Sequence, residues 1–123
     1  MIAYPLFVFA KDDHSMRVIE EEGRILHDLE AIDIQNDEYV FWDASGDGVA
    51  VTVSLGRFKR KLERVAACPS VFSIRDAFMS YAKSLGVAEP IAEGAPMDIW
   101  NRLQSEVERR PSKKGLLSRL LSR

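Results

Sequence analysis

The alternation of apolar and polar positions along the chain predicts a sheet. Residues 4–10 form a short apolar run rich in β-branched and aromatic side chains, which is typical of a central strand. After a polar turn, residues 16–20 form a candidate second strand that pairs back on the first. The clearest unit is a hairpin, in which residues 39–42 enter a turn at 43–48 and apolar residues then occupy every second position as far as Leu55.

Helical spacing appears in three further segments. Residues 21–31 predict a helix with Ile25, Leu26 and Leu29 on one face, although Gly23 costs about 1 kcal/mol relative to alanine. Ser15 is an alternative start for a longer helix there. Residues 73–85 predict the best-defined helix of the chain.

The ends of the later helices are marked in the sequence. Ser73 is suited to the N-cap because an acid follows three residues later, and Gly86 is suited to the position after the last turn. A last helix is expected to start at Pro96, with Trp100, Leu103 and Val107 on its inner face. Residues 57–67 fit either a helix or a strand, and we favour a strand.

These elements predict an α+β fold. We expect a four- to five-stranded, mostly antiparallel sheet with two or three helices packed mainly on one face. Residues 1–110 are expected to form a single domain, and residues 111–123 a basic amphipathic C-terminal tail. In that tail, leucines at 116, 117, 120 and 121 fall on one helical face.

The length and composition favour a small protein of the cytoplasm. A chain of 123 residues can bury a core without disulfides, and the single cysteine, Cys68, excludes an internal disulfide. The apolar run at 2–10 has no preceding lysine or arginine and is interrupted by Pro5, so we interpret it as a strand and not as a secretory signal. No apolar run approaches the ~20 residues of a membrane span.

Charge divides the chain into two unlike parts. Residues 1–56 contain twelve acids and three bases, a net charge of −9, whereas residues 57–123 contain fourteen bases and seven acids, a net charge of +7. The stretch 28–47 contains no lysine or arginine. If its acids converge on one face, that face can attract a basic protein and accelerate the encounter.

The candidate partner-binding residues come from this acidic stretch. Trp42 is included as an apolar anchor, provided that it is partly exposed. The set is Asp33, Asp37, Glu38, Trp42, Asp43 and Asp47.

Two basic segments are the counterpart of the acidic half. Five bases fall between Arg57 and Arg64, where we expect pairing with the acidic half or solvation. Nucleic acid is not the expected partner, because the patch is short and the isoelectric point is about 5.7. Six bases and no acid follow from Arg109 to the end. Membrane contact is expected only through residues 113–123, which could also dock on a partner or fray.

No arrangement of residues predicts catalysis, a cofactor or a metal site. Residues 43–48 resemble the opening of a calcium loop, but Ser54 stands where that loop has its bidentate glutamate, so we favour a tight turn. His14 and His27 are the only histidines and are interpreted as surface residues. Cys68 has no evident base or orienting group, as a nucleophile would need.

A resemblance to known proteins rests on three short runs, at residues 19–22, 29–34 and 38–44. Together they resemble a strand–helix–hairpin arrangement in small uncharacterised bacterial α+β proteins, some of which act as immunity proteins against secreted toxins. The resemblance covers about residues 4–85 and carries no functional residue across. It implies a second strand at 16–20 and a strand at 57–67.

The sequence therefore predicts a non-enzymatic protein-binding module of the immunity or inhibitor type, which occludes a basic partner with an acidic surface. A first alternative is a small enzyme or ligand-binding domain with a pocket lined by Tyr39, Trp42, His27 or Asp43. A second is an accessory subunit that docks through its C-terminal tail.

Overall fold

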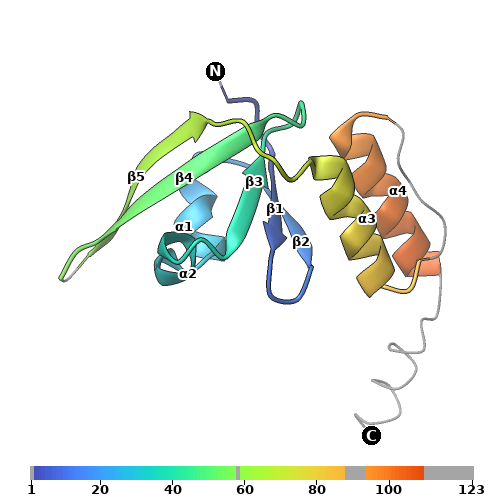
Figure 1. Ribbon diagram of the computed structural model, residues 1–123, viewed down its shortest axis with the longest axis horizontal. Helices are drawn as coiled ribbons and strands as arrows, with labels where there is room; N and C mark the ends of the chain where they lie inside the picture. The colour runs from blue at the N-terminus through green and yellow to red at the C-terminus, as the bar shows by residue number, and fades with distance from the viewer. Residues whose placement is uncertain (1, 58, 88–93, 110–123) are drawn as a thin grey trace, which may run out of the picture.

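Five strands form one antiparallel sheet in the computed structural model, which describes residues 2–57, 59–87 and 94–109. Their order in the sheet is β2-β1-β3-β4-β5, and each neighbouring pair is antiparallel (Figure 1). The strands are β1 (Leu6–Ala10), β2 (Met16–Ile19), β3 (Tyr39–Trp42), β4 (Gly48–Leu55) and β5 (Arg60–Ala67). The predicted α+β class, the antiparallel sheet and the strand within residues 57–67 are confirmed.

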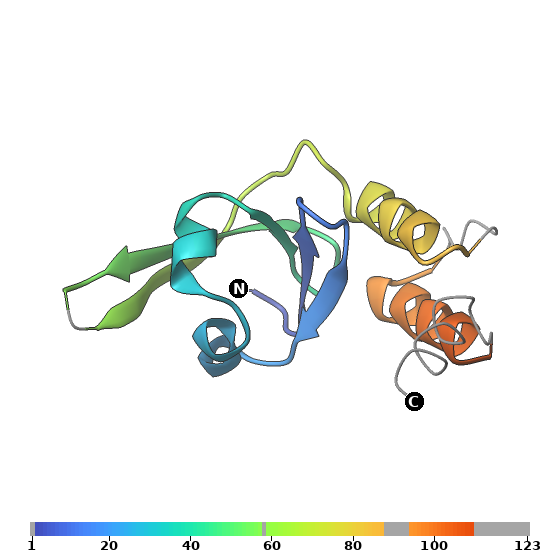
Figure 2. The ribbon, with the colours of Figure 1, turned by 90° about the horizontal axis from the view of Figure 1, so that it is seen from below.

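Helices cover both faces of the sheet, which differs from the expected packing mainly on one face (Figures 1 and 2). On one face α3 (Ile74–Ser84) and α4 (Pro96–Arg109) pack with Phe7, Phe9 and Trp42. On the other, α1 (Ile25–Asp28) and α2 (Ala31–Gln35) pack with Leu6, Val8 and Phe41. The physical reason lies in β1, where four consecutive residues from Leu6 to Phe9 are buried, so both faces need cover.

The single helix expected at 21–31 is wrong. The chain forms a short 3₁₀ helix, η1 (Glu22–Arg24), then α1, and becomes extended at Leu29 and Glu30 before α2 begins. Leu29 is 3% exposed, and Ile25 and Ile34 are buried in the same cluster. In an uninterrupted helix Ile25 and Leu29 would share one apolar stripe but Ile34 would face away from it, so the break allows Ile34 to face the sheet as well.

The C-terminal pair of helices follows the sequence pattern. The Ser73 hydroxyl accepts a hydrogen bond from the Asp76 backbone N–H at 3.1 Å, which is the predicted N-cap. Leu103 is buried and Trp100 stacks on Tyr81 of α3 at a ring separation of 6.1 Å. No helix among the described residues is long and apolar enough to cross a membrane. The predicted tail at 111–123 lies outside the described residues.

Residues 68–72 connect β5 to α3 and cross close to the start of β4. Gly48 permits this approach, since a Cβ atom there would meet the Cys68 carbonyl oxygen and would lie 2.8 Å from the Ser70 nitrogen. The Cys68 N–H donates to the Gly48 carbonyl at 2.9 Å. The connection is thereby held beside the sheet, where it forms one wall of the candidate site.

Candidate functional site

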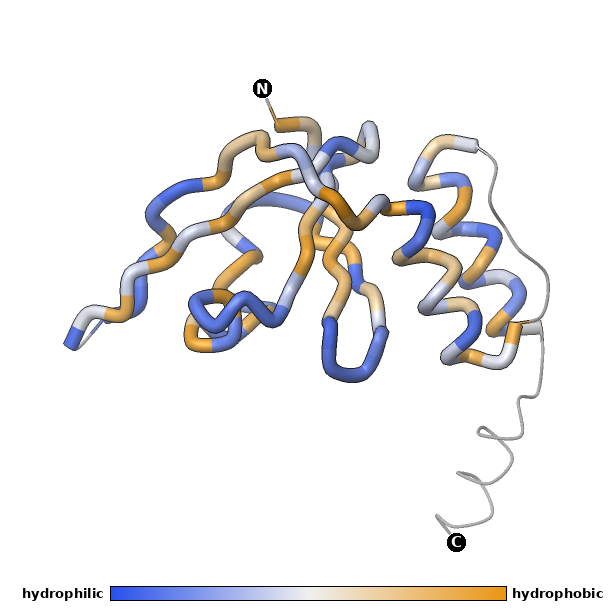
Figure 3. The backbone as a smooth tube through the Cα atoms, in the orientation of Figure 1, coloured by the Kyte–Doolittle hydropathy of each residue, from blue (hydrophilic) through white to orange (hydrophobic). Residues whose placement is uncertain are grey.

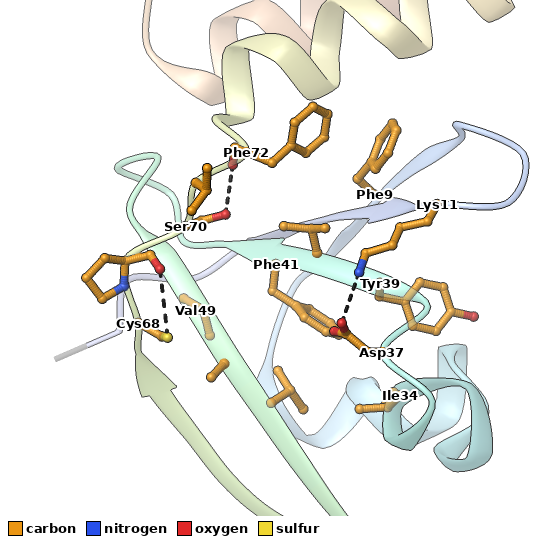
Figure 4. Close-up of a pocket in the computed structure, with 15 residues that line it drawn as sticks. Phe9, Lys11, Ile34, Asp37, Tyr39, Phe41, Val49, Cys68, Ser70 and Phe72 are labelled. Carbon is orange, nitrogen blue, oxygen red and sulfur yellow. Dashed lines mark hydrogen bonds and ion pairs between the residues drawn. The ribbon is translucent and has the colours of Figure 1, made fainter.

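A groove with a volume of about 640 Å³ opens between β3 and β4 (Figure 4). Its walls come from β1, α2, β3, β4 and the 68–72 connection, and most of the side chains are apolar. The lining residues are Phe9, Lys11, Ile34, Asp37, Tyr39, Val40, Phe41, Val49, Ala50, Val51, Cys68, Pro69, Ser70, Val71 and Phe72. A concave, largely apolar surface with few polar groups is typical of a binding site.

The groove exists because the pairing of β3 with β4 stops after two residue pairs. Phe41 pairs with Val49 and Trp42 with Gly48, and in the same register Tyr39 would pair with Val51. In an antiparallel ladder every second residue turns its backbone N–H and C=O groups toward the same neighbouring strand. The backbone groups of Tyr39 therefore point toward β4, and those of Val51 point toward β3. The strands diverge there, and both residues line the groove instead. Two open strand edges therefore face the cavity.

Aromatic packing fixes the wall made by the 68–72 connection. The indole Nε1–H of Trp42 donates to the Phe72 carbonyl at 3.2 Å, and the Ser70 hydroxyl donates to the same oxygen at 2.8 Å. The ring of Phe72 lies 5.1 Å from that of Phe9. Next to this anchor, Val71 is fully exposed. The wall is therefore rigid at Phe72 and offers an uncovered apolar side chain beside it.

Asp37 stands at the rim of the groove in a backbone conformation that suits glycine. Its φ is 58°, and it follows α2 at the position where helices commonly end in glycine. The Asp37 N–H donates to the Ile34 carbonyl and the Glu38 N–H to the Asp33 carbonyl, both at 3.1 Å, so the helix end is satisfied. The Asp37 carboxylate reaches Lys11 Nζ at 3.1 Å across the rim (Figure 4).

Exchanging Asp37 for glycine or alanine separates backbone strain from charge. Both substitutions remove the carboxylate and its exposed ion pair with Lys11, which contributes at most about 1 kcal/mol. Only glycine adopts the positive φ without steric cost, so Asp37→Gly is expected to be more stable than Asp37→Ala by about 1 kcal/mol. Urea unfolding followed by circular dichroism measures the difference, and equal stabilities of the two variants would contradict it.

Negative charge gathers at the groove end formed by the β1–β2 turn and the α2–β3 connection, both hydrophilic in Figure 3. We call Asp12, Asp33, Asp37 and Glu38 the acidic end. Burial raises the pKa of the Tyr39 phenol, and the negative charges of Asp33, Asp12 and Glu38 raise it further. Tyr39 therefore remains a neutral hydrogen-bonding group until the pH passes above the usual range of tyrosine.

The six predicted partner-binding residues do not form one face. Asp33, Asp37 and Glu38 lie before β3, and Asp43 and Asp47 lie after it. Because a strand rises about 3.3 Å per residue, Glu38 and Asp43 are roughly 17 Å apart. Of the predicted set, only Asp33, Asp37 and Glu38 therefore lie at the same end of β3.

Two of the six residues serve the fold. Trp42 is 1% exposed, so the condition for a surface anchor is not met. Asp43 is 6% exposed, and its Oδ1 accepts hydrogen bonds from the backbone N–H groups of Ser45 at 2.9 Å and Asp47 at 3.0 Å. This carboxylate organises the β3–β4 turn, as the turn interpretation of residues 43–48 predicts.

The two histidines and the cysteine are exposed residues of the described ranges. His27 is exposed beside Asp28, with Nδ1 3.1 Å from Oδ1, and His14 is exposed beside Ser80. Cys68 is exposed at the groove and its sulfur lies 3.9 Å from the Pro69 carbonyl oxygen. No group of three or more potential metal ligands is found among the described residues. Of the four residues expected around a ligand pocket, Tyr39 lines the groove and Trp42, His27 and Asp43 do not.

The groove itself was not predicted from the sequence, since its lining residues come from four separated stretches of the chain. One signal was present: the apolar run at 39–42 is half as long as the alternating run that pairs with it. Searches against protein-family models, curated proteins and solved structures gave no match to this chain.

Proposed function

We propose that this protein is a non-enzymatic protein-binding module whose groove receives an extended segment of another polypeptide. The observation that carries the proposal is the interrupted pairing of β3 with β4, which leaves Tyr39 and Val51 facing a largely apolar cavity. The partner segment adds to an open strand edge through its backbone, while its side chains enter the cavity.

Strand addition suits this site for two physical reasons. An open strand edge presents N–H and C=O groups with which an extended chain can pair. Every second side chain of the bound segment then points to the same face and can be buried in the cavity. The lining offers Val40, Val49 and Val51 to apolar side chains on the partner segment. Backbone hydrogen bonds then provide affinity, and the apolar side chains provide specificity.

The charge at the mouth favours a basic partner. Asp33, Asp37 and Glu38 belong to the acidic end, where Lys11 pairs with Asp37 at the rim and the charge of Arg17 partly offsets the effect of the acids on the pKa of Tyr39. A lysine or arginine flanking the bound strand therefore finds carboxylates there, which accelerates the encounter. An inhibitor of the immunity type that occludes a basic toxin is consistent with this proposal, and a toxin gene beside the gene for this chain would support it.

A designed peptide tests the proposal. The probe is a short peptide of alternating valine and threonine with a lysine at each end, and its control has the same side chains with N-methylated valines. We expect the probe to shift the amide resonances of Tyr39, Val40 and Val51 in ¹⁵N NMR spectra. The methylated peptide should bind at least tenfold more weakly, because it lacks the donors that a strand edge needs.

Cys68 provides an independent readout of the same complex. It is the only cysteine of the chain, and it is exposed on the wall of the groove. The bound probe should therefore slow its reaction with a thiol reagent, and the methylated control should not. Equal binding of the two peptides, or resonance shifts confined to residues away from the groove, would contradict strand addition.

A further inference from the structure

The β4–β5 hairpin extends beyond the rest of the sheet as a two-stranded ribbon. β3 accompanies β4 only as far as the Phe41–Val49 pair, whereas β4 and β5 stay paired as far as Leu55 and Arg60. In Figures 1 and 2 this ribbon projects away from α3 and α4. We call residues 51–57 and 59–65 the arm.

The two faces of the arm differ in cover and chemistry. Val51, Val53 and Leu62 lie on the face that packs toward α1 and α2. On the opposite face Thr52 is paired with Arg64 and Ser54 with Lys61. The helices α3 and α4 lie over β1 and β2 and do not reach this second face (Figure 1). It is therefore an open surface of small polar residues and long cations, with one acid, Glu63, next to Arg64 at the register shift.

The cations of this open face have no carboxylate partner among the described residues. Lys59, Lys61 and Arg64 are exposed, and none of them forms an ion pair there. Of the two outcomes expected for this patch, pairing with the acidic half or solvation, these three residues show solvation. Arg60 differs, since it borders a shallow pocket together with Asp28 and Glu30. It points to the helix-covered face and is not counted in the proposed surface.

We propose that the arm binds a nucleic-acid duplex, with Lys59, Lys61 and Arg64 contacting phosphates. The major groove of B-DNA admits a two-stranded β-ribbon, and the short side chains of Thr52 and Ser54 allow the ribbon to lie close to the groove. Binding is favoured when unpaired surface cations neutralise phosphates, because the counterions held by those phosphates are released. Because the three cations are assigned to phosphates, and phosphate contacts carry no sequence information, binding is expected to be independent of base sequence.

The projection of the arm places this surface away from part of the negative charge of the chain, whose net charge is −2. The acidic end lies beside α2 and the β1–β2 turn, and the tip of the arm lies well away from that turn in Figure 1. At physiological ionic strength the screening length is about 8 Å. Phosphates at the tip of the arm are therefore largely screened from Asp12 in that turn.

Fluorescence anisotropy with a labelled duplex of about twenty base pairs tests the proposal on the full chain. Three phosphate contacts predict that the logarithm of the association constant falls with the logarithm of salt concentration with a slope of about −3. The double variant Lys61→Glu/Arg64→Glu should bind at least tenfold more weakly at low salt. The matched control is Arg75→Glu/Lys83→Glu on α3, which makes the same charge change at exposed sites.

Competition and a milder variant complete the test. Lys61→Gln/Arg64→Gln removes the charge without reversing it, and it should lower the salt slope by about two. Equal binding by the arm variant and the α3 control would overturn the proposal, because the duplex would then be held elsewhere. Displacement of the duplex by polyglutamate as efficiently as by unlabelled duplex would also overturn it, and would assign the arm to acidic proteins.

Discussion

Replacing Trp42 with alanine is expected to lower the free energy of unfolding by about 3–5 kcal/mol, the largest effect predicted for a single residue of this protein. Trp42 is 1% exposed in the cluster that joins the sheet to α3 and α4. Its indole also donates the hydrogen bond to Phe72. Alanine therefore leaves a cavity in the main core and releases the wall of the groove.

Trp42→Phe separates the two contributions. Phenylalanine retains most of the apolar volume and loses the indole N–H. The Phe72 carbonyl still accepts from the Ser70 hydroxyl, so no buried acceptor is left unpaired and the loss should be about 1–2 kcal/mol. Urea unfolding monitored by circular dichroism measures both variants. A loss below about 1 kcal/mol for Trp42→Ala would show that this residue does not hold the two layers together.

Local patterns predicted most of the elements because each depends on neighbouring residues. Alternation from Val49 to Leu55 indicated β4, and the Ser73 hydroxyl marked the start of α3. The Asp43 carboxylate fits the same principle, since it bonds to N–H groups two and four residues along the chain. Structure that is determined within a few residues can be inferred from the sequence.

Features that depend on distant contacts were not predicted. The break at Leu29 brings Ile34 of α2 into the same cluster as Ile25 and Leu29, and helical periodicity within 21–31 contains no information about that surface. Helices on both faces follow from the position of β1 between β2 and β3, which is a property of strand order. The same limit applies to the acidic stretch: proximity in sequence suggested one face, but β3 separates its two halves.

The groove illustrates how function depends on such distant relationships. Its opening requires β3 to be four residues long and β4 to be eight, and it also requires the 68–72 connection to pass close to Gly48. Each fact has a trace in the sequence, but none of them alone indicates a cavity. Together they leave Tyr39 and Val51 unpaired with each other, although the register of β3 and β4 would place these two residues opposite one another.

Filling the groove at Ala50 is expected to weaken binding of the alternating valine–threonine probe at least tenfold. Ala50 lines the cavity, and its neighbour Val51 provides the open edge of β4. A tryptophan at position 50 occupies the volume that the side chains of an added strand need. Because Ala50 is only half-buried, the large ring can remain partly in solvent and should cost little stability.

Thr52→Trp is the matched control for Ala50→Trp. Thr52 lies two residues farther along β4, on the same face, and is exposed outside the groove. It therefore receives the same bulky ring without obstructing the cavity, and probe affinity should stay within about twofold of the original protein. Titration calorimetry measures both variants. If both weaken binding equally, the probe lies along the whole face of β4; if neither does, the cavity between β3 and β4 is not where an extended segment binds.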